Sequence, residues 1–236
     1  MALFSARANE IKANLMSVQQ RIAAGCAAAD RDPSGVRLIV VTKTYPASDI
    51  RLLSELGVTD IGENRDQEAR VKRLECADLP LTWHMIGQVQ QKKAISVVSW
   101  ADVVHSLDRP ELVDRIGRAA QGANRHIGIF LQVSLDPEQH ANRGGASMGE
   151  IEGLVDHVLS WEHLDLLGVM GVAPHPGDPR SAFARLSLAS ALVMTKVPSA
   201  DQISAGMSGD LEAALYRGAT HVRLGGAVLG IRTLYP

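Results

Sequence analysis

The stretch Val36-Arg37-Leu38-Ile39-Val40-Val41-Thr42-Lys43 decides the fold of this chain. It is a run of β-branched and aliphatic residues with little polar relief, which is typical of a strand buried on both faces in a parallel sheet. Pro33 and Gly35 mark a turn before it, and Pro46 marks its end. An ammonium at the end of a buried strand is costly unless it is paired or used chemically. The octapeptide alone favours a Lys43 that reaches solvent or a carboxylate, whereas the rest of the chain favours a chemical role.

The alternation of strand and helix recurs along the whole chain. Strands are expected at 36–43, 58–62, 81–87, 101–107, 126–134, 164–172, 202–206 and 221–225. Helices are expected at 48–56, 64–76, 88–98, from Pro110 onward, and at 148–159, 181–194 and 208–217, with a further helix at 3–29. Such alternation predicts a parallel sheet with right-handed crossovers. Eight units favour a closed (β/α)8 TIM barrel with an extra N-terminal helix, because the open doubly wound sheet usually stops at about five or six strands. We expect residues 1–236 to form a single domain.

Composition excludes several classes of protein. Apolar residues make up 46% of the 236 residues, charged residues 21%, and the formal net charge is −2, with no basic stripe for nucleic acid or an anionic membrane. Cys26 and Cys76 do not form a C-x-x-C motif, so we expect two free buried thiols in a reducing compartment. The N-terminus lacks the pattern of a signal peptide, and no apolar run approaches the ~20 residues of a membrane span. These features predict a cytoplasmic protein.

The candidate chemistry lies at the carboxyl ends of the expected strands, where barrels of this kind carry their sites. Ser208 is expected at the start of a helix between Gly206 and Gly209, where free N–H groups and the helix dipole favour an anion. Gly225-Gly226 lets backbone amides approach a ligand without a Cβ in the way. Phosphate binding after strands 7 and 8 recurs in this fold. The alternative is a simple helix cap and a simple turn, but the coincidence of both features favours phosphate.

Arg223 lies inside the last strand, and a buried guanidinium needs a partner because it cannot shed its proton. That partner is either a strand carboxylate such as Glu63 or a ligand atom. Lys43, a phosphate site and an inward arginine together suggest a phosphorylated carbonyl compound held as a Schiff base. Pyridoxal 5′-phosphate (PLP) fits, with the arginine facing its ring nitrogen. His84 and His105 lie on neighbouring strands without the His-x-His of barrel metal hydrolases, so we expect core or supporting residues rather than metal ligands.

Five motifs then follow one another at the expected strand ends. They are Val41-Thr42-Lys43-Thr44-Tyr45-Pro46, Gly62-Glu63-Asn64-Arg65-Asp66-Gln67-Glu68, Trp83-His84-Met85-Ile86-Gly87, Gly206-Met207-Ser208-Gly209-Asp210-Leu211-Glu212-Ala213-Ala214 and Val222-Arg223-Leu224-Gly225. In this order they resemble the pyridoxal-phosphate homeostasis proteins, the single-domain relatives of the alanine racemase barrel. The resemblance implies a Schiff base at Lys43 and an arginine, Arg223, at the pyridine nitrogen. It also implies further cofactor-binding residues, which are Asn64, Met85, Met207, Ser208, Gly225 and Gly226.

Three positions depart from the pattern of that family. Tyr45 stands where the family usually has a second lysine, Gly226 where it has Thr or Ser, and Gly209 where it has Asp. Tyr45 therefore removes a possible alternative amine. Gly226 removes a hydroxyl from the phosphate site, so we expect a lower affinity for PLP.

The resemblance implies a carrier or regulator of PLP rather than an enzyme. Racemases of this lineage take a second acid–base group from an added β-domain and a partner subunit, and we expect no such domain here. An arginine at the ring nitrogen also disfavours the protonated pyridine that carbanion chemistry uses. We therefore expect a monomer that binds PLP without substrate turnover, with PLP-dependent apoenzymes as candidate recipients. Two alternatives stay open, a low-activity PLP-dependent amino-acid racemase and a Schiff-base barrel enzyme of the aldolase type, which would lack a pyridoxal absorption band.

Overall fold

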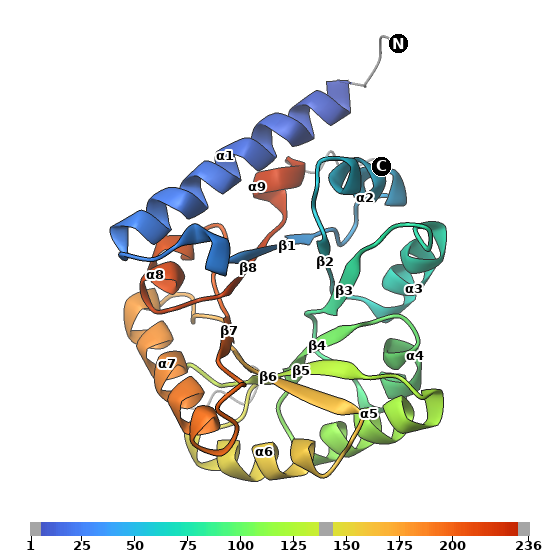
Figure 1. Cartoon of the computed structure of the whole chain (residues 1–236), viewed down its shortest axis with the longest axis vertical. Helices are drawn as coiled ribbons and strands as arrows, with labels where there is room; N and C mark the ends of the chain where they lie inside the picture. The colour runs from blue at the N-terminus through green and yellow to red at the C-terminus, as the bar shows by residue number, and fades with distance from the viewer. Residues whose placement is uncertain (1–5, 137–143, 231–236) are drawn as a thin grey trace.

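The computed structural model of the chain describes residues 6–136 and 144–230. Within them, eight parallel strands pair in sequence order and β8 pairs with β1, which closes a barrel (Figure 1). The strands are β1 (Arg37–Val41), β2 (Asp60–Glu63), β3 (Thr82–Met85), β4 (Val103–Leu107), β5 (Ile127–Gln132), β6 (Leu164–Met170), β7 (Gln202–Ser204) and β8 (His221–Leu224). The predicted (β/α)8 barrel is confirmed.

Helices surround the barrel on its outside (Figure 1). They are α1 (Ala6–Ala28), α2 (Ala47–Glu55), α3 (Asp66–Glu75), α4 (Ala94–Val98), α5 (Pro110–Ala123), α6 (Ile151–Leu159), α7 (Pro179–Lys196), α8 (Leu211–Tyr216) and α9 (Gly226–Leu229), with 3-10 turns η1 (Pro33–Gly35), η2 (Gln91–Lys93) and η3 (Met148–Glu150). The apolar side chains of α1 recur every three or four residues and are buried at Ile11, Leu15, Val18 and Ile22. The extra N-terminal helix therefore packs against α8 and α9 through one face.

Several boundaries differ from those expected at the ends of the strands. β1 pairs with β2 only as far as Val41, so Lys43 lies in a turn two residues beyond the strand. The helix after β7 begins at Leu211 rather than at Ser208, because a turn intervenes. Gly225-Gly226, which reads as a turn, instead opens the short helix α9. These shifts move three predicted site segments from regular elements into the loops above the barrel.

The core has two parts with different chemistry. An apolar layer lies between the sheet and the helices, and its largest fully buried side chains include Trp83, Trp100 and Phe183. The barrel interior instead contains buried polar side chains, including His84 and His105, and the His105 ring stacks on Phe130 with their centroids 4.4 Å apart. The two histidines are thus core residues, as predicted. Cys26 and Cys76 are buried free thiols.

In the part of the chain that is described, no helix is long and apolar enough to cross a membrane. The same residues contain no cluster of three His, Cys, Asp or Glu side chains arranged to hold a metal ion.

Candidate functional site

A cavity of about 320 Å³ opens at the carboxyl ends of the strands, beside the closure of the barrel. It is lined by Val41, Lys43, Tyr45, Asn64, Ile86, Val172, Met207, Ser208, Arg223, Gly225 and Gly226. Of the predicted site residues, this set contains all but Met85. A larger hollow of about 740 Å³ lies between α4 and α5 and contains none of the predicted site residues, so size alone would not locate the site.

Lys43 is the only lysine among the residues that line the cavity. Its side chain is half-buried and forms no hydrogen bond or ion pair with any residue of the described ranges. An ammonium carries three hydrogen-bond donors, and no residue of the described ranges accepts from them. It is therefore available to a ligand in the cavity.

The turn that carries Lys43 is held on both sides by one buried ionic cluster. The Thr42 hydroxyl donates to Glu63 Oε1 (2.6 Å), and the Lys72 ammonium donates to the Thr42 carbonyl (2.7 Å). Lys72 also pairs with Glu63 (2.8 Å) and with Glu68 (2.6 Å), and Glu68 accepts the backbone N–H of Thr44. This last bond holds Thr44 in a left-handed conformation (φ 68°), which a β-branched residue rarely adopts.

This cluster was not predicted, although the Glu68–Lys72 spacing of four residues on a helix was a usable signal. Burial raises the pKa of Glu63, and the contacts with Lys72 and Thr42 oppose that rise. The cluster therefore keeps charges of opposite sign together beneath the turn and leaves the Lys43 amine outside it.

Backbone groups from the loops after β7 and β8 form the opposite wall of the cavity. Ser208 lies in the turn before α8, three residues ahead of the helix, which corrects its expected place at a helix start. The Met207 N–H donates to Asp210 Oδ1 (2.6 Å) and so is not free for an anion. The N–H of Gly226 belongs to the first residue of α9 and has no partner within that helix.

The two glycines after β8 differ in what surrounds them. A Cβ on Gly225 would lie 3.0 Å from the Val41 carbonyl oxygen, so a glycine permits the close approach of this loop to β1. A Cβ on Gly226 would meet no atom within 4 Å. The glycine at 226 is therefore not required by the packing of the protein.

Arg223 lies on β8 with 5% of its surface exposed, and its guanidinium borders the cavity. Its Nη1–H donates to Ser204 Oγ (2.6 Å) and its Nη2–H donates to the Gly171 carbonyl (3.0 Å). Glu63, the alternative partner, is bound by Lys72 and Thr42 instead. Burial lowers the pKa of Arg223 to about 10, and Asp210 acts against this, so the guanidinium stays charged at neutral pH.

Met85 and Tyr45 are the remaining residues beside the cavity. Met85 is buried on β3 and borders a neighbouring hollow with Asn64, while Ile86 provides the apolar wall of the Lys43 cavity. Tyr45 donates its hydroxyl to the Gly230 carbonyl (2.8 Å), which ties the Lys43 turn to the end of α9. The residue that replaces the second lysine thus has a structural contact of its own.

Comparison with known proteins relates this geometry to a family. The family model for the N-terminal domain of alanine racemase matches residues 8–233. The pyridoxal phosphate homeostasis protein of Corynebacterium glutamicum is 39% identical over 224 residues, which cover 92% of this chain and 100% of that protein. The chain belongs to the pyridoxal phosphate homeostasis protein family.

Other members of the pyridoxal phosphate homeostasis protein family show a similar extent of agreement. The protein of that name from Pseudomonas aeruginosa is 38% identical over 226 residues, covering 94% of this chain and 96% of its own. The structure of PipY from Synechococcus elongatus, solved with PLP bound, superposes with a TM-score of 0.80 at 31% identity, covering 93% of this chain and all of PipY. The family relationship therefore spans the whole barrel, including the strand ends that form the cavity.

Proposed function

We propose that this protein binds PLP in the Lys43 cavity and acts in intracellular PLP homeostasis, holding the cofactor as a Schiff base on Lys43 without substrate turnover. The observation that carries the proposal is the Lys43 amine, which has no partner among the described residues and shares one cavity with Ser208, Arg223 and Gly226. The names of the curated relatives and the PLP bound to PipY support the same cofactor.

The residues of the cavity fit the chemical groups of PLP. When bound, the cofactor supplies an aldehyde that condenses with an amine and a pyridine ring that accepts electron density. Lys43 offers the amine, and the Ser208 hydroxyl and the Gly226 amide offer donors to a phosphate. Arg223 offers a donor to the ring nitrogen. A volume of about 320 Å³ is at the small end of ligand pockets, as a single-ring cofactor requires.

The same residues argue against turnover of an amino-acid substrate. Racemisation needs one proton acceptor and one proton donor on opposite faces of the substrate carbon. Besides Lys43, the cavity-lining residue of the described ranges that could move a proton is Tyr45, and its hydroxyl donates to the Gly230 carbonyl. The cationic Arg223 disfavours a protonated ring nitrogen, which weakens carbanion stabilisation. Binding without turnover is the function these groups support.

We propose that the functional unit is a monomer. We place this function in the cytoplasm, where two free buried cysteines are typical. The recipients of released PLP are PLP-dependent apoenzymes.

The absorption spectrum of the purified protein tests the proposal. We expect a pyridoxal band, and reduction with borohydride should fix the cofactor to the peptide that contains Lys43. Lys43→Ala should abolish the fixed label, while Lys92→Ala, an exposed lysine outside the cavity, should retain it. A label on a peptide without Lys43 would refute the Schiff-base assignment, and a missing band after incubation with PLP would favour an aldolase-type enzyme. Loss of optical activity of L-alanine at saturating PLP would move the protein to the racemases.

A further inference from the structure

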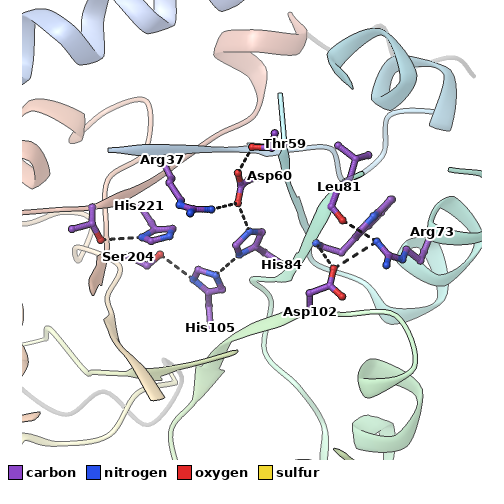
Figure 2. Close-up of polar contacts among 12 residues, drawn as sticks. Arg37, Thr59, Asp60, Arg73, Leu81, His84, Asp102, His105, Ser204 and His221 are labelled. Atoms are coloured by element: carbon purple, nitrogen blue, oxygen red, sulfur yellow. Dashed lines mark hydrogen bonds and ion pairs between the residues drawn. The ribbon is translucent and has the colours of Figure 1, made fainter. Parts of the chain in front are cut away.

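A continuous row of hydrogen bonds crosses the barrel interior and ends at Arg223. Arg223 Nη1 lies 2.6 Å from Ser204 Oγ, and Ser204 Oγ lies 3.0 Å from His105 Nδ1. His105 Nε2 lies 2.9 Å from His84 Nδ1, and His84 Nε2 lies 3.0 Å from Asp60 Oδ1 (Figure 2). We call Asp60, His84, His105 and Ser204 the interior chain. Each of its members is at most 5% exposed, so the row is shielded from water along its length.

The end of the interior chain remote from Arg223 is an ionised carboxylate. Burial raises the pKa of Asp60, but hydrogen bonds from His84 and Thr59 (Thr59 Oγ1 to Asp60 Oδ2, 2.6 Å) outweigh burial, so its pKa is lowered. The Arg37 guanidinium lies 3.6 Å from the same carboxylate and favours its charge. Asp60 can therefore only accept a hydrogen bond, and His84 must carry a proton on Nε2.

The direction of every other bond follows if His84 carries that one ring proton only. Its Nδ1 is then an acceptor, and His105 donates from its Nε2. Burial and the nearby His84 and Arg223 hold the pKa of His105 well below its usual value, so its ring is neutral. With the single ring proton on Nε2, Nδ1 is unprotonated. His105 Nδ1 then accepts the Ser204 hydroxyl proton. Ser204 Oγ is left with lone pairs only, which Arg223 fills as a donor.

We propose that the interior chain acts as a set of positioning residues that hold Arg223 as a hydrogen-bond donor toward the ring nitrogen of the ligand in the Lys43 cavity. With its own proton committed to His105, Ser204 can offer Arg223 only an acceptor. That acceptor and the Gly171 carbonyl hold two of the five guanidinium N–H groups and fix the plane of the group. If Arg223 left this position, Ser204 would lose a charged donor in a buried site, which is costly. The identity of the ligand rests on the proposed function, whereas the hydrogen bonds of the interior chain do not depend on it.

The histidine tautomers test the hydrogen-bond directions of the interior chain in the protein without ligand. In protein labelled with nitrogen-15 in histidine, long-range proton–nitrogen correlation spectra at pH 7.5 should show both His84 and His105 as neutral rings protonated on Nε2. Single His84→Gln and His105→Gln variants assign the signals. A His105 ring protonated on Nδ1, or a doubly protonated His84, would reverse the bonds and overturn the proposal. The decisive spectrum is that of the wild-type protein, and the variants serve only to assign its signals.

Binding to two matched ligands tests the effect on Arg223. Ser204→Ala should weaken PLP about fivefold to tenfold, because a misplaced donor loses one hydrogen bond, and should leave unchanged the affinity for the analogue with CH in place of the ring nitrogen. Ser190 is a buried serine on α7 that does not belong to the interior chain, and Ser190→Ala should change neither affinity. Equal weakening of both ligands by Ser204→Ala, or no weakening of either, would refute the positioning role. If the wild type bound neither ligand, the proposed function would be wrong. The tautomer spectra would still test the direction of the hydrogen bonds in the interior chain.

Discussion

Gly226→Ser should tighten PLP binding because it adds a hydroxyl where the phosphate is expected. The structure has room for the change, since a Cβ at this position meets no atom within 4 Å and the backbone is not in the left-handed region. A hydrogen bond to a charged group contributes about 1.5–3 kcal/mol, and ordering a side chain costs up to about 1 kcal/mol for a small residue. The net gain is about 0.5–2 kcal/mol, which corresponds to about a 2- to 30-fold lower dissociation constant.

The assay is a spectroscopic titration of the wild type and two variants with PLP and with pyridoxal. Gly226→Ala supplies the Cβ without the hydroxyl and should bind PLP like the wild type. Gly226→Ser should improve only the phosphorylated ligand. If the serine variant bound PLP no more tightly than the alanine variant, or if pyridoxal gained equally, Gly226 would not border the phosphate.

Three further predictions concern the cavity and the barrel interior. Ser208→Ala should weaken PLP binding by about 1–2 kcal/mol and leave pyridoxal binding unchanged, as measured in the same titration, and equal losses would remove Ser208 from the phosphate site. Wild type at saturating PLP should show no exchange of the alanine α-proton in heavy water above the free-cofactor background by NMR, and Arg223→Glu should gain slow exchange; rapid exchange by wild type would indicate a racemase. Burial lowers the pKa of His221 to about 3. The unfolded chain therefore binds this proton near pH 6.5 while the folded chain does not, and the free energy of unfolding should fall by about 1.4 kcal/mol per pH unit below pH ~6.5. Urea unfolding at pH 7 and pH 5 should show a smaller fall for His221→Gln, and an unchanged fall would refute this role for His221.

The barrel could be predicted from sequence because each strand carries its own local signal. The stretch that contains β1 is apolar and is flanked by turn residues on both sides. It could therefore be recognised as a strand without information about the rest of the chain. The exact end of β1 could not be predicted, because pairing stops where Thr42 turns its hydroxyl toward Glu63 on β2. Helix α9 was missed because two consecutive glycines have the composition of a turn.

The candidate site was predictable as a set of residues but not as a network. Lys43 and Arg223 could be named because a charge directly after a buried apolar run, or inside one, is unusual in itself. The partner of Arg223 could not be named, since Ser204 is an ordinary strand residue until the barrel brings it 2.6 Å from the guanidinium. The bond from His105 on β4 to Ser204 on β7 likewise crosses the barrel between strands that are not neighbours. Such contacts depend on how the barrel closes and on the stagger between its strands, and no local sequence pattern encodes either.

The seam between β1 and β8 has a consequence for the order of events in the cell. Val40 pairs with Leu224 across this seam, with the Lys43 turn on one side and Gly225 on the other. During synthesis the amine emerges early, and the last strand that completes its pocket emerges near the end. The cavity is therefore complete only after β8 has paired with β1. Because a ligand that binds only the folded state stabilises it by mass action, a ligand in this cavity would stabilise the closed barrel against unfolding.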